Sequence, residues 1–340
     1  MKRALITGIT GQDGVLLAGN LLGHGYEVIG FGRRASLLAR TDLHELFGRL
    51  TLFHGDVANS VDLADALLKH QPDELYNLAA QSAPGASWAQ SLETGEITAM
   101  GAHRLFEAVR RFAPRCRVYH ASSSEMFGAV LQSPQCETTP FNPANPYAAA
   151  KVYAHDMARI YRRSYGMFIA CGILFNHESP LRRMNFLTQK VALGAACAKL
   201  RVRQSRVLNE EGEPLVKDGK VALGNLDAGR DWGHARDYVE AMRRMLQQDQ
   251  ADDFVIGTGR LRTVRDLCQA AYGYVGKDWR EYVTTDPRFL RPNETGPTVA
   301  DASKARRLLG WAPTISFEEM IAEMVDAHVA ALQAPQTALP

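Results

Sequence analysis

The chain has 340 residues, of which 46% are hydrophobic and 22% are charged. This composition is ordinary for a soluble globular protein and excludes a disordered, collagen-like or fibrous chain. The 39 Lys and Arg residues and the 37 Asp and Glu residues give a formal net charge of +2. So small a charge creates no global field to attract nucleic acid or an anionic membrane, so we expect neither as a partner.

We also expect no membrane span, no disulfide framework and no bound metal. The most apolar stretch after the N-terminal strand, residues 167–175, is far shorter than the roughly 20 residues that a membrane helix needs. The apolar stretch after the basic start of the chain already stops at Gly8, and polar Gln12 and Asp13 follow, so the apolar region of a signal peptide does not form. The five cysteines are widely spaced and form no C-x-x-C pair. These features indicate a soluble, cytoplasmic protein.

Short apolar runs alternate with amphipathic segments of helical length through the first half of the chain. In chain order we expect strands at residues 3–7, 27–31, 50–54, 74–78, 117–121 and 168–174, with helices at 14–23, 61–69 and 99–112. Near-continuous apolar strands that alternate with helices indicate a parallel sheet covered on both faces. The predicted class is therefore α/β, a Rossmann-type doubly wound parallel sheet with strand order 3-2-1-4-5-6.

The alternation stops after Asn176, where we expect a second lobe to begin. Residues 209–214 predict a turn between two short strands, and helices are expected at 235–247, 264–274 and 317–332. We assign residues 1–175 to a Rossmann domain, to which segments of about 222–250 return. Residues 176–221 and 251–340 would mainly form a smaller, mostly C-terminal, substrate-binding lobe.

Three glycines, Gly8, Gly11 and Gly14, connect the first predicted strand to the first predicted helix. A turn without Cβ atoms lets backbone N–H groups and the helix N-terminus approach a pyrophosphate. A merely glycine-rich connection would contain the same residues. Their position directly between a strand and a helix favours a dinucleotide site.

The second predicted strand ends without the acidic residue that NAD-binding folds use for the ribose 2′-hydroxyl. Arg33 and Arg34 stand there instead, and two guanidinium groups suit a 2′-phosphate. The sequence therefore favours NADP over NAD, although two solvated arginines on a loop would give the same pattern. Asp56, after the third strand, is either a hydrogen-bond acceptor for the adenine amino group or an ordinary surface residue.

Tyr147 and Lys151 are four residues apart and so share one face of a predicted helix. A neighbouring ammonium group lowers the pKa of a tyrosine, so we expect Tyr147 to act as a base near neutral pH. Lys151 can also hold the nicotinamide ribose, and a hydroxyl from residues 122–124 can bind the substrate oxygen. A single Y-x-x-x-K pair is common by chance, but together with the glycine turn it indicates a redox centre.

These motifs resemble the extended short-chain dehydrogenase/reductase superfamily. Within it, the chain is similar over nearly its whole length to the GDP-mannose 4,6-dehydratase family. The stretches that carry the similarity are residues 5–14, 76–82, 122–128, 172–180, 223–227, 230–233 and 237–242. Phe-Asn-His-Glu-Ser-Pro at 175–180 and Arg-Asp-Trp-Gly at 230–233 are the most specific of these.

The resemblance implies a redox-neutral reaction on a GDP-linked hexose. Tyr147 takes the proton of the C4 hydroxyl while NADP takes the C4 hydride, and the resulting ketone acidifies the C5–H bond. Glu125 then removes the C5 proton, water leaves from C6, and the hydride returns to C6. Ser123 supplies the hydroxyl for which the family usually has Thr. Glu125, two residues later, lies on the same side of an extended segment, although a surface Glu would fit the sequence too.

The resemblance also assigns binding residues. For the NADP cofactor they are Gly8, Gly11, Gln12, Asp13, Gly14, Arg33, Arg34, Asp56, Val57, Leu78, Ala79, Ala80, Tyr147, Lys151, Leu174, Asn176 and His177. For the substrate they are Ser82, Ser123, Glu125, Asn176, Lys190, Arg230, Arg291 and Glu294. In relatives, the segment after the Arg pair reaches a neighbouring subunit. A homodimer or homotetramer is therefore expected. Residues 33–40 are either the contact or a simple solvated loop.

Three departures from the family pattern lie near the sugar or nucleotide end. The segment after Glu294 lacks an acidic residue, Arg183 replaces a usual glycine, and the polar stretch at 203–220 is longer. A GDP-heptose or another modified hexose therefore stays open as the substrate. A nucleotide-sugar 4-epimerase or 4-ketoreductase is the second hypothesis. The third is a non-catalytic NADP-sensing protein, against which the complete Tyr147/Lys151 pair argues.

Overall fold

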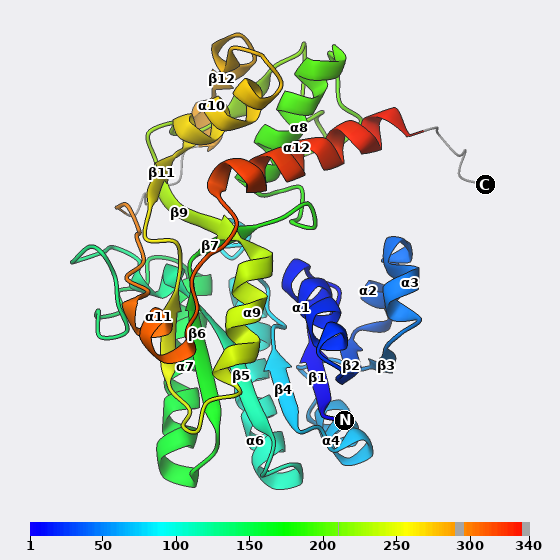
Figure 1. The fold of residues 1–340 in the computed structure, drawn as a ribbon, viewed down its shortest axis with the longest axis vertical. Helices are drawn as coiled ribbons and strands as arrows, with labels where there is room; N and C mark the ends of the chain where they lie inside the picture. Colours follow the sequence, from blue (N-terminus) through cyan, green and yellow to red (C-terminus); the bar gives the residue numbers. More distant parts are fainter. Residues whose placement is uncertain (210, 290–295, 335–340) are drawn as a thin grey trace.

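The structure is a computed structural model that describes residues 1–209, 211–289 and 296–334. Its larger part, here called the main body, is built on a parallel seven-stranded sheet below a smaller lobe (Figure 1). The strands lie in the order β3 (Thr51–His54), β2 (Glu27–Gly32), β1 (Arg3–Thr7), β4 (Glu74–Asn77), β5 (Arg117–Ser123), β6 (Ile169–Leu174) and β10 (Asp253–Ile256). The predicted order 3-2-1-4-5-6 is confirmed, and β10 adds a strand beside β6.

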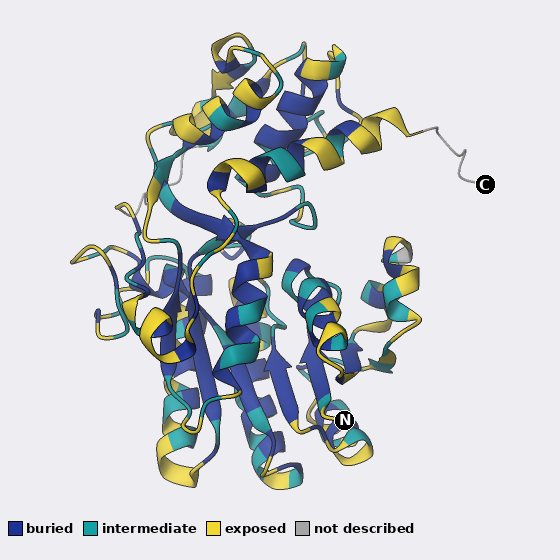
Figure 2. Cartoon of the chain, in the orientation of Figure 1, coloured by how far each residue is buried: buried dark blue, intermediate teal, exposed yellow. Residues whose placement is uncertain are grey.

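Helices cover both faces of this sheet, and its inner strands are accordingly mostly dark blue, or buried, in Figure 2, whereas the edge strand β3 has no buried residue. One face packs against α1 (Gln12–Gly23), α9 (Ala235–Met245) and α11 (Ser303–Leu309). The other packs against α4 (Ser60–His70), α6 (Gly101–Phe112) and α7 (Pro146–Tyr165). Every residue of β4 and β6 is buried; this follows from the apolar run of β6, whereas β4 also buries the polar Glu74 and Asn77.

Strand β10 lies beyond residue 250, where the return of the chain to the main body was expected to end. Phe254, Val255 and Ile256 pair in parallel with β6, and each is at most 2% exposed. They cover what would otherwise be an open edge of β6. The boundary predicted near residue 250 is therefore wrong for this strand. The strand was missed because a run of four residues gives little periodic signal.

The smaller lobe is built around three helices, α8 (Leu187–Leu200), α10 (Val264–Tyr274) and α12 (Phe317–Gln333), which share one apolar core. One small sheet has the order β11 (Leu261–Thr263), β9 (Gly229–His234) and β7 (Asn176–Glu178), and β12 (Val283–Thr285) pairs with β8 (Val221–Leu223). Strand β7 follows β6 directly, so the chain passes from the main sheet into the lobe within a few residues. This crossing places residues 176–178 between the two bodies.

The polar stretch at residues 203–220 forms turns rather than the two short strands expected around residues 209–214. Its pairing is limited to isolated bridges, one of them between Leu208 and Pro214. The side chain of Asn209 holds the turn by accepting hydrogen bonds from the backbone N–H groups of Glu211 and Glu213. On either side of this bridge, the backbone N–H groups of Asn209 and Leu215 donate to the carbonyl oxygens of Glu213 and Val207, so the missing N–H group of Pro214 costs no pairing here.

Short elements complete the described chain. They are the helices α2 (Arg34–Leu38), α3 (His44–Phe47) and α5 (Ser91–Thr94), a π-helical segment at Gly95–Met100, and 3₁₀ turns at Thr41–Leu43, Ser124–Phe127, Trp279–Glu281 and Pro287–Phe289. Among the described residues, no helix combines the length and the apolar character that crossing a bilayer requires. All five cysteines fall within these residues, and none forms a disulfide.

Glu240 joins the two long helices on one face of the main sheet. Its carboxylate accepts hydrogen bonds from Arg243 and Arg244 on α9, at 2.8 and 2.7 Å, and from Asn20 on α1, at 3.3 Å. Burial by itself would raise the pKa of Glu240, but the two guanidinium groups outweigh it and lower the pKa to about 2.

We expect E240Q to lower the free energy of unfolding at neutral pH by about 1 kcal/mol. Because the folded-state pKa lies below the ordinary value, this contribution is complete at neutral pH and is lost as the pH falls toward about 2. Urea denaturation of both proteins at neutral and acidic pH measures the effect. A difference between the two proteins that is independent of pH would contradict it.

Candidate active site

A pocket of about 620 Å³ lies at the carboxyl ends of the main-sheet strands, between the main body and the smaller lobe. Its wall includes the glycine turn before α1, the end of β5, the start of α7, strand β7 and the start of α8. In open α/β sheets, ligands bind outside the carboxyl ends of the strands. The fold therefore places this pocket where such a ligand would lie.

The glycine turn fits a group that must approach the backbone closely. Gly8 has a φ of +71°, and a Cβ atom there would lie 2.9 Å from the backbone N of Ala79. A Cβ on Gly14 would lie 2.5 Å from the Gly8 carbonyl oxygen. Helix α1 begins at Gln12, two residues earlier than predicted, and its cap residue Gly11 offers no side chain to the first N–H groups. These N–H groups form a cradle suited to a pyrophosphate.

The side chains beside the turn tie it to strand β7. Gln12 donates to the backbone oxygen of His177 at 3.0 Å and accepts from Ser179 at 2.9 Å. Asp13 lies 2.8 Å from Nε2 of His177, whose Nδ1 faces the carbonyl oxygen of Phe175 at 2.7 Å. Burial would lower the pKa of His177, but Asp13 outweighs it and raises the pKa. Both ring nitrogens face acceptors, which suits an imidazolium.

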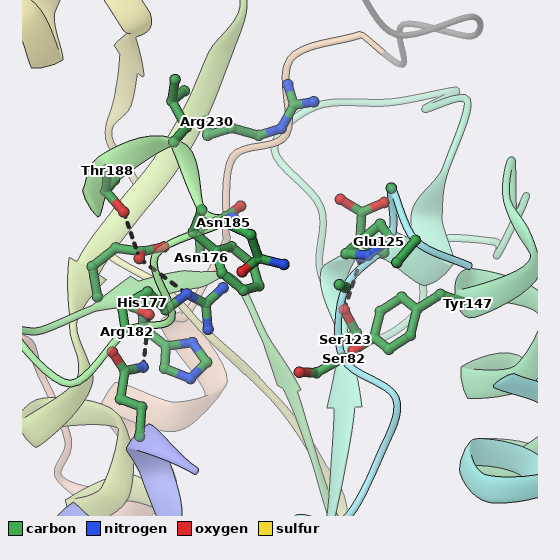
Figure 3. A pocket seen from close by; sticks show the side chains of 18 of the residues that line it. Ser82, Ser123, Glu125, Tyr147, Asn176, His177, Arg182, Asn185, Thr188 and Arg230 are labelled. Atoms are coloured by element: carbon green, nitrogen blue, oxygen red, sulfur yellow. Dashed lines mark hydrogen bonds and ion pairs between the residues drawn. The ribbon is translucent and has the colours of Figure 1, made fainter. Parts of the chain in front are cut away.

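Ser123, Glu125, Tyr147 and Lys151 line this pocket together. Ser123 ends β5, and Glu125 lies in the 3₁₀ turn that follows, so the prediction that one extended segment carries both residues is wrong. Tyr147 and Lys151 lie on the buried face of α7 and are 8% and 4% exposed. In Figure 3, Ser123, Glu125 and Tyr147 stand close together on one side of the pocket.

Local hydrogen bonds fix these side chains. The Ser123 hydroxyl accepts a hydrogen bond from the backbone N–H of Glu125 at 3.2 Å. Asn145, the cap residue of α7, accepts from the backbone N–H of Ala148 at 2.8 Å and donates to the Glu125 carboxylate at 3.0 Å. The residue that starts the tyrosine helix thus also orients the carboxylate beside the tyrosine.

The pKa of Tyr147 differs from the expectation drawn from the sequence. Burial raises it to about 12, and the hydrogen bond with Ser123 opposes the rise only in part. The Lys151 ammonium donates to the Ala121 carbonyl oxygen at 2.6 Å and lies 5.8 Å from the centre of the tyrosine ring. Burial also lowers the pKa of Lys151, to about 8. The predicted lowering by Lys151 is therefore wrong for the protein without ligands, because removal from water dominates both groups.

Several other predicted cofactor residues, namely Leu78, Ala80, Leu174 and Asn176, line the pocket as well. Five do not line it, namely Arg33, Arg34, Asp56, Val57 and Ala79. The two arginines are exposed at the start of α2, directly after β2. The Asp56 carboxylate accepts from the backbone N–H of Ala58 at 3.0 Å.

Of the predicted substrate residues, Ser82, Lys190 and Arg230 line the pocket, while Arg291 and Glu294 lie outside the described residues. The sequence reasoning missed Arg182, Asn185, Asn209, Glu211, Arg288 and Phe289, which also line the pocket. Arg182 pairs with Glu178 at 3.1 Å, and its guanidinium lies 3.6 Å from the centre of the Phe186 ring. Arg182 lies next to Arg183, one of the departures from the family pattern, so the sequence offered a reason to consider it as a binding residue. No motif in the sequence marks Arg288.

Comparison with known proteins agrees with this geometry. The family model described as GDP-mannose 4,6 dehydratase matches residues 5–324. The chain belongs to this family. It is 42% identical to GDP-mannose 4,6 dehydratase 1 of Arabidopsis thaliana, over 96% of this chain and 89% of that one. It is 41% identical to the GDP-mannose 4,6-dehydratase of Yersinia enterocolitica, over 100% and 96% of the two chains.

Solved structures share the fold. A dTDP-glucose 4,6-dehydratase from Streptomyces venezuelae, with NAD and TYD bound, has a TM-score of 0.78 at 26% identity, over 96% of each chain. A UDP-glucose 4-epimerase from Thermotoga maritima has a TM-score of 0.82 at 21% identity, over 97% of this chain and all of that one. The expected superfamily fold and the GDP-mannose 4,6-dehydratase family are thus confirmed.

We expect G14A to abolish binding of a nicotinamide dinucleotide, because the added Cβ would overlap the Gly8 carbonyl oxygen and close the cradle. The matched control is G19A on the same helix, where an added Cβ meets nothing within 4 Å. This control should keep binding and alter stability by no more than about 1 kcal/mol. Fluorescence titration with cofactor measures both, and equal affinities would contradict the assignment.

Proposed function

We propose that the protein converts GDP-mannose to GDP-4-keto-6-deoxymannose with NADP as the cofactor. The observation that carries the proposal is the Glu125 carboxylate, which shares one pocket with Ser123, Tyr147 and Lys151 beside the glycine turn. An epimerase or a simple dehydrogenase needs the hydroxyl, phenol and amine but has no use for a further acid or base. Family membership supports the same reaction.

Tyr147 and Ser123 act at the C4 hydroxyl of the hexose. When bound, an oxidised nicotinamide dinucleotide would supply hydride acceptance and return, together with a positive charge near the phenol. Tyr147, whose pKa burial raises to about 12, needs such a charge to accept a proton near neutral pH. Ser123 holds the substrate oxygen by a hydrogen bond while the proton moves to the phenol oxygen.

Glu125 acts at C5 and C6. Once C4 is a ketone, the neighbouring C5–H bond is acidic enough for a carboxylate to remove its proton. The protonated Glu125 can then give a proton to the departing C6 hydroxyl, so that one side chain serves as base and acid in turn. The hydrogen bond from Asn145 to one carboxylate oxygen orients Glu125, whose side chain lines the pocket.

Cationic side chains on the smaller-lobe side of the pocket suit the substrate pyrophosphate. Arg230, at the start of β9, and Lys190, on α8, both line the pocket. A guanidinium group binds phosphate oxygens in a bidentate manner, which favours Arg230 for this role. Because Asn209 and Glu211 of the long polar stretch also reach the pocket wall, a GDP-heptose or another modified hexose is the second candidate substrate.

Mass spectrometry of the product tests the reaction. Loss of one water from GDP-mannose, with no net change in NADPH absorbance, is the expected result. An unchanged mass would favour a 4-epimerase, whereas stoichiometric use of NADPH would indicate a reductase. Turnover of a GDP-heptose but not of GDP-mannose would contradict the proposed substrate and support the proposed dehydration.

We expect E125Q to fold and bind cofactor normally but to lose dehydration by roughly 100-fold or more in kcat, since the amide cannot take a proton. E93Q changes an exposed glutamate on α5, away from the pocket lining, and should keep full activity. Formation of the 6-deoxy-4-keto product by E125Q at the wild-type rate would remove Glu125 from the mechanism.

The preference for NADP should depend on the arginines after β2. Each of R33A and R34A is expected to weaken NADP⁺ binding roughly tenfold, through loss of charge-assisted bonds to the 2′-phosphate, and to leave NAD⁺ binding unchanged. R49A removes an exposed arginine before β3 and serves as the control. Equal affinity of the wild-type protein for the two cofactors would contradict the assignment.

We also propose a cytoplasmic homodimer or homotetramer in which residues 33–40 contact a neighbouring subunit. In the single chain, Arg40 from this segment donates to the Thr10 carbonyl oxygen at 2.6 Å, so the segment already borders the glycine turn. Light scattering measures the assembly, and a monomer at assay concentration would overturn this proposal.

A further inference from the structure

A row of buried polar side chains runs from the pocket wall to the edge of the main sheet. The Ser122 hydroxyl on β5 lies 2.8 Å from Nδ1 of His155 on α7. Nε2 of His155 lies 3.5 Å from the carboxylate of Asp253 on β10. The three residues are 3%, 1% and 7% exposed, so water hardly competes for these contacts. The reaction described above uses none of the three.

With Cys171, two of these residues form a group whose ligand atoms are close enough to hold a metal ion. Two guanidinium groups already occupy this cluster. Arg162 lies 2.6 Å from one Asp253 oxygen and 3.7 Å from Cys171 Sγ, and Arg159 lies 3.4 Å from the other oxygen. A metal cation would have to displace these charges or meet their repulsion. The cluster is therefore better suited to hydrogen bonding than to metal binding.

The row begins among the residues proposed to do the chemistry. Ser122 stands between Ala121, whose carbonyl oxygen accepts from the Lys151 ammonium at 2.6 Å, and Ser123. His155 lies one helical turn beyond Lys151 and two turns beyond Tyr147, on the same buried face of α7. The end of β5 is therefore joined to this face of α7 by two consecutive residues, through Lys151 and through His155.

The surroundings of His155 favour one tautomer. The Asp253 carboxylate, held ionised by Arg162, can only accept, so it favours a proton on Nε2. Nδ1 is then an acceptor for the Ser122 hydroxyl. The ring of Phe141 packs edge-on against the imidazole, with centres 5.2 Å apart and planes at 88°. The imidazole is thus fixed both in orientation and in hydrogen-bonding role.

We propose that His155 is a positioning residue that sets the height and rotation of α7 against β5, so that Tyr147 and Ser123 meet the same substrate oxygen. It acts through Ser122 and is itself anchored by Asp253. A displacement of about 1 Å in a catalytic group can cost up to 100-fold in rate. Loss of a single hydrogen bond that positions α7 is therefore expected to lower kcat. The inference relies on the proposed function for its kinetic assay.

Two near-isosteric variants separate the two contacts of His155. H155N keeps an amide near the position of Nδ1 and so keeps a partner for Ser122, whereas H155Q extends its amide toward the position of Nε2 and Asp253. We expect H155N to keep kcat for GDP-mannose within about threefold of wild type and H155Q to lose roughly 10-fold or more. KM and the Kd of the cofactor should stay within about twofold.

S122A removes the other end of the same contact and should lower kcat as much as H155Q. The double variant S122A/H155Q should be no slower than either single variant, because both remove one interaction. If the losses of kcat in S122A and H155Q multiply in the double variant, the two residues do not act through one interaction and the proposal is wrong. A wild-type kcat in H155Q would also contradict it.

H103N is the matched control, because it weakens another contact of α7 away from the site. His103 on α6 also contacts this helix, with Nδ1 2.9 Å from the Tyr153 hydroxyl and Nε2 3.2 Å from that of Tyr161, but it does not line the pocket. It should lower the melting temperature about as much as H155Q and leave kcat unchanged. If H103N loses as much kcat as H155Q, then His155 only stabilises the helix and does not position the site, and the proposal is wrong.

A substrate-free measurement separates this inference from the proposed function. The imidazole ¹⁵N resonances of His155 should report a proton on Nε2, and S122A should shift the Nδ1 resonance. A proton on Nδ1, or no response to S122A, would overturn the inference even in an active enzyme. If the resonances are as expected but the wild-type protein does not dehydrate GDP-mannose, only the proposed function is overturned.

Discussion

The arrangement of the site depends on one contact surface, the buried face of α7 against the end of β5. Tyr147 and Lys151 lie on this face, and Ser123 and Glu125 follow from the strand it covers. Neither element could shift alone, because the ammonium of Lys151 is fixed to the backbone of the strand at Ala121. The relative position of a phenol, a hydroxyl and a carboxylate is therefore set by the packing of a helix on a sheet.

The same surface explains the electrostatics of the ligand-free pocket. A side chain packed this closely loses its hydration, and for Tyr147 and Lys151 that loss dominates every neighbouring charge. Both groups are pushed toward their neutral forms. Their useful charge states thus depend on what binds in the pocket, which links protonation at the site to occupancy.

The sequence predicts the main body well because its signals are local and repeated. Continuous apolar strands, amphipathic helices and a glycine turn between them were enough for the strand order and for the grouping of Tyr147 with Ser123. The four residues of β10 were missed because a short run has no period to detect. Arg288 and Phe289 reach the pocket through tertiary folding of an irregular segment, which no local pattern records. The pKa of Tyr147 was misjudged because sequence spacing reveals a neighbouring charge but not the depth of burial.

The path of the chain between its two bodies has a consequence for how this protein can change. Residues 176–178 leave the main sheet for the smaller lobe, α9 and β10 return, and α10, α11 and α12 then alternate between the bodies. Neither body is a continuous piece of sequence, so no single crossover in the gene could exchange one for the other. New sugar preferences would have to arise within the chain itself, by point substitution or by changes in the loops at the rim of the pocket.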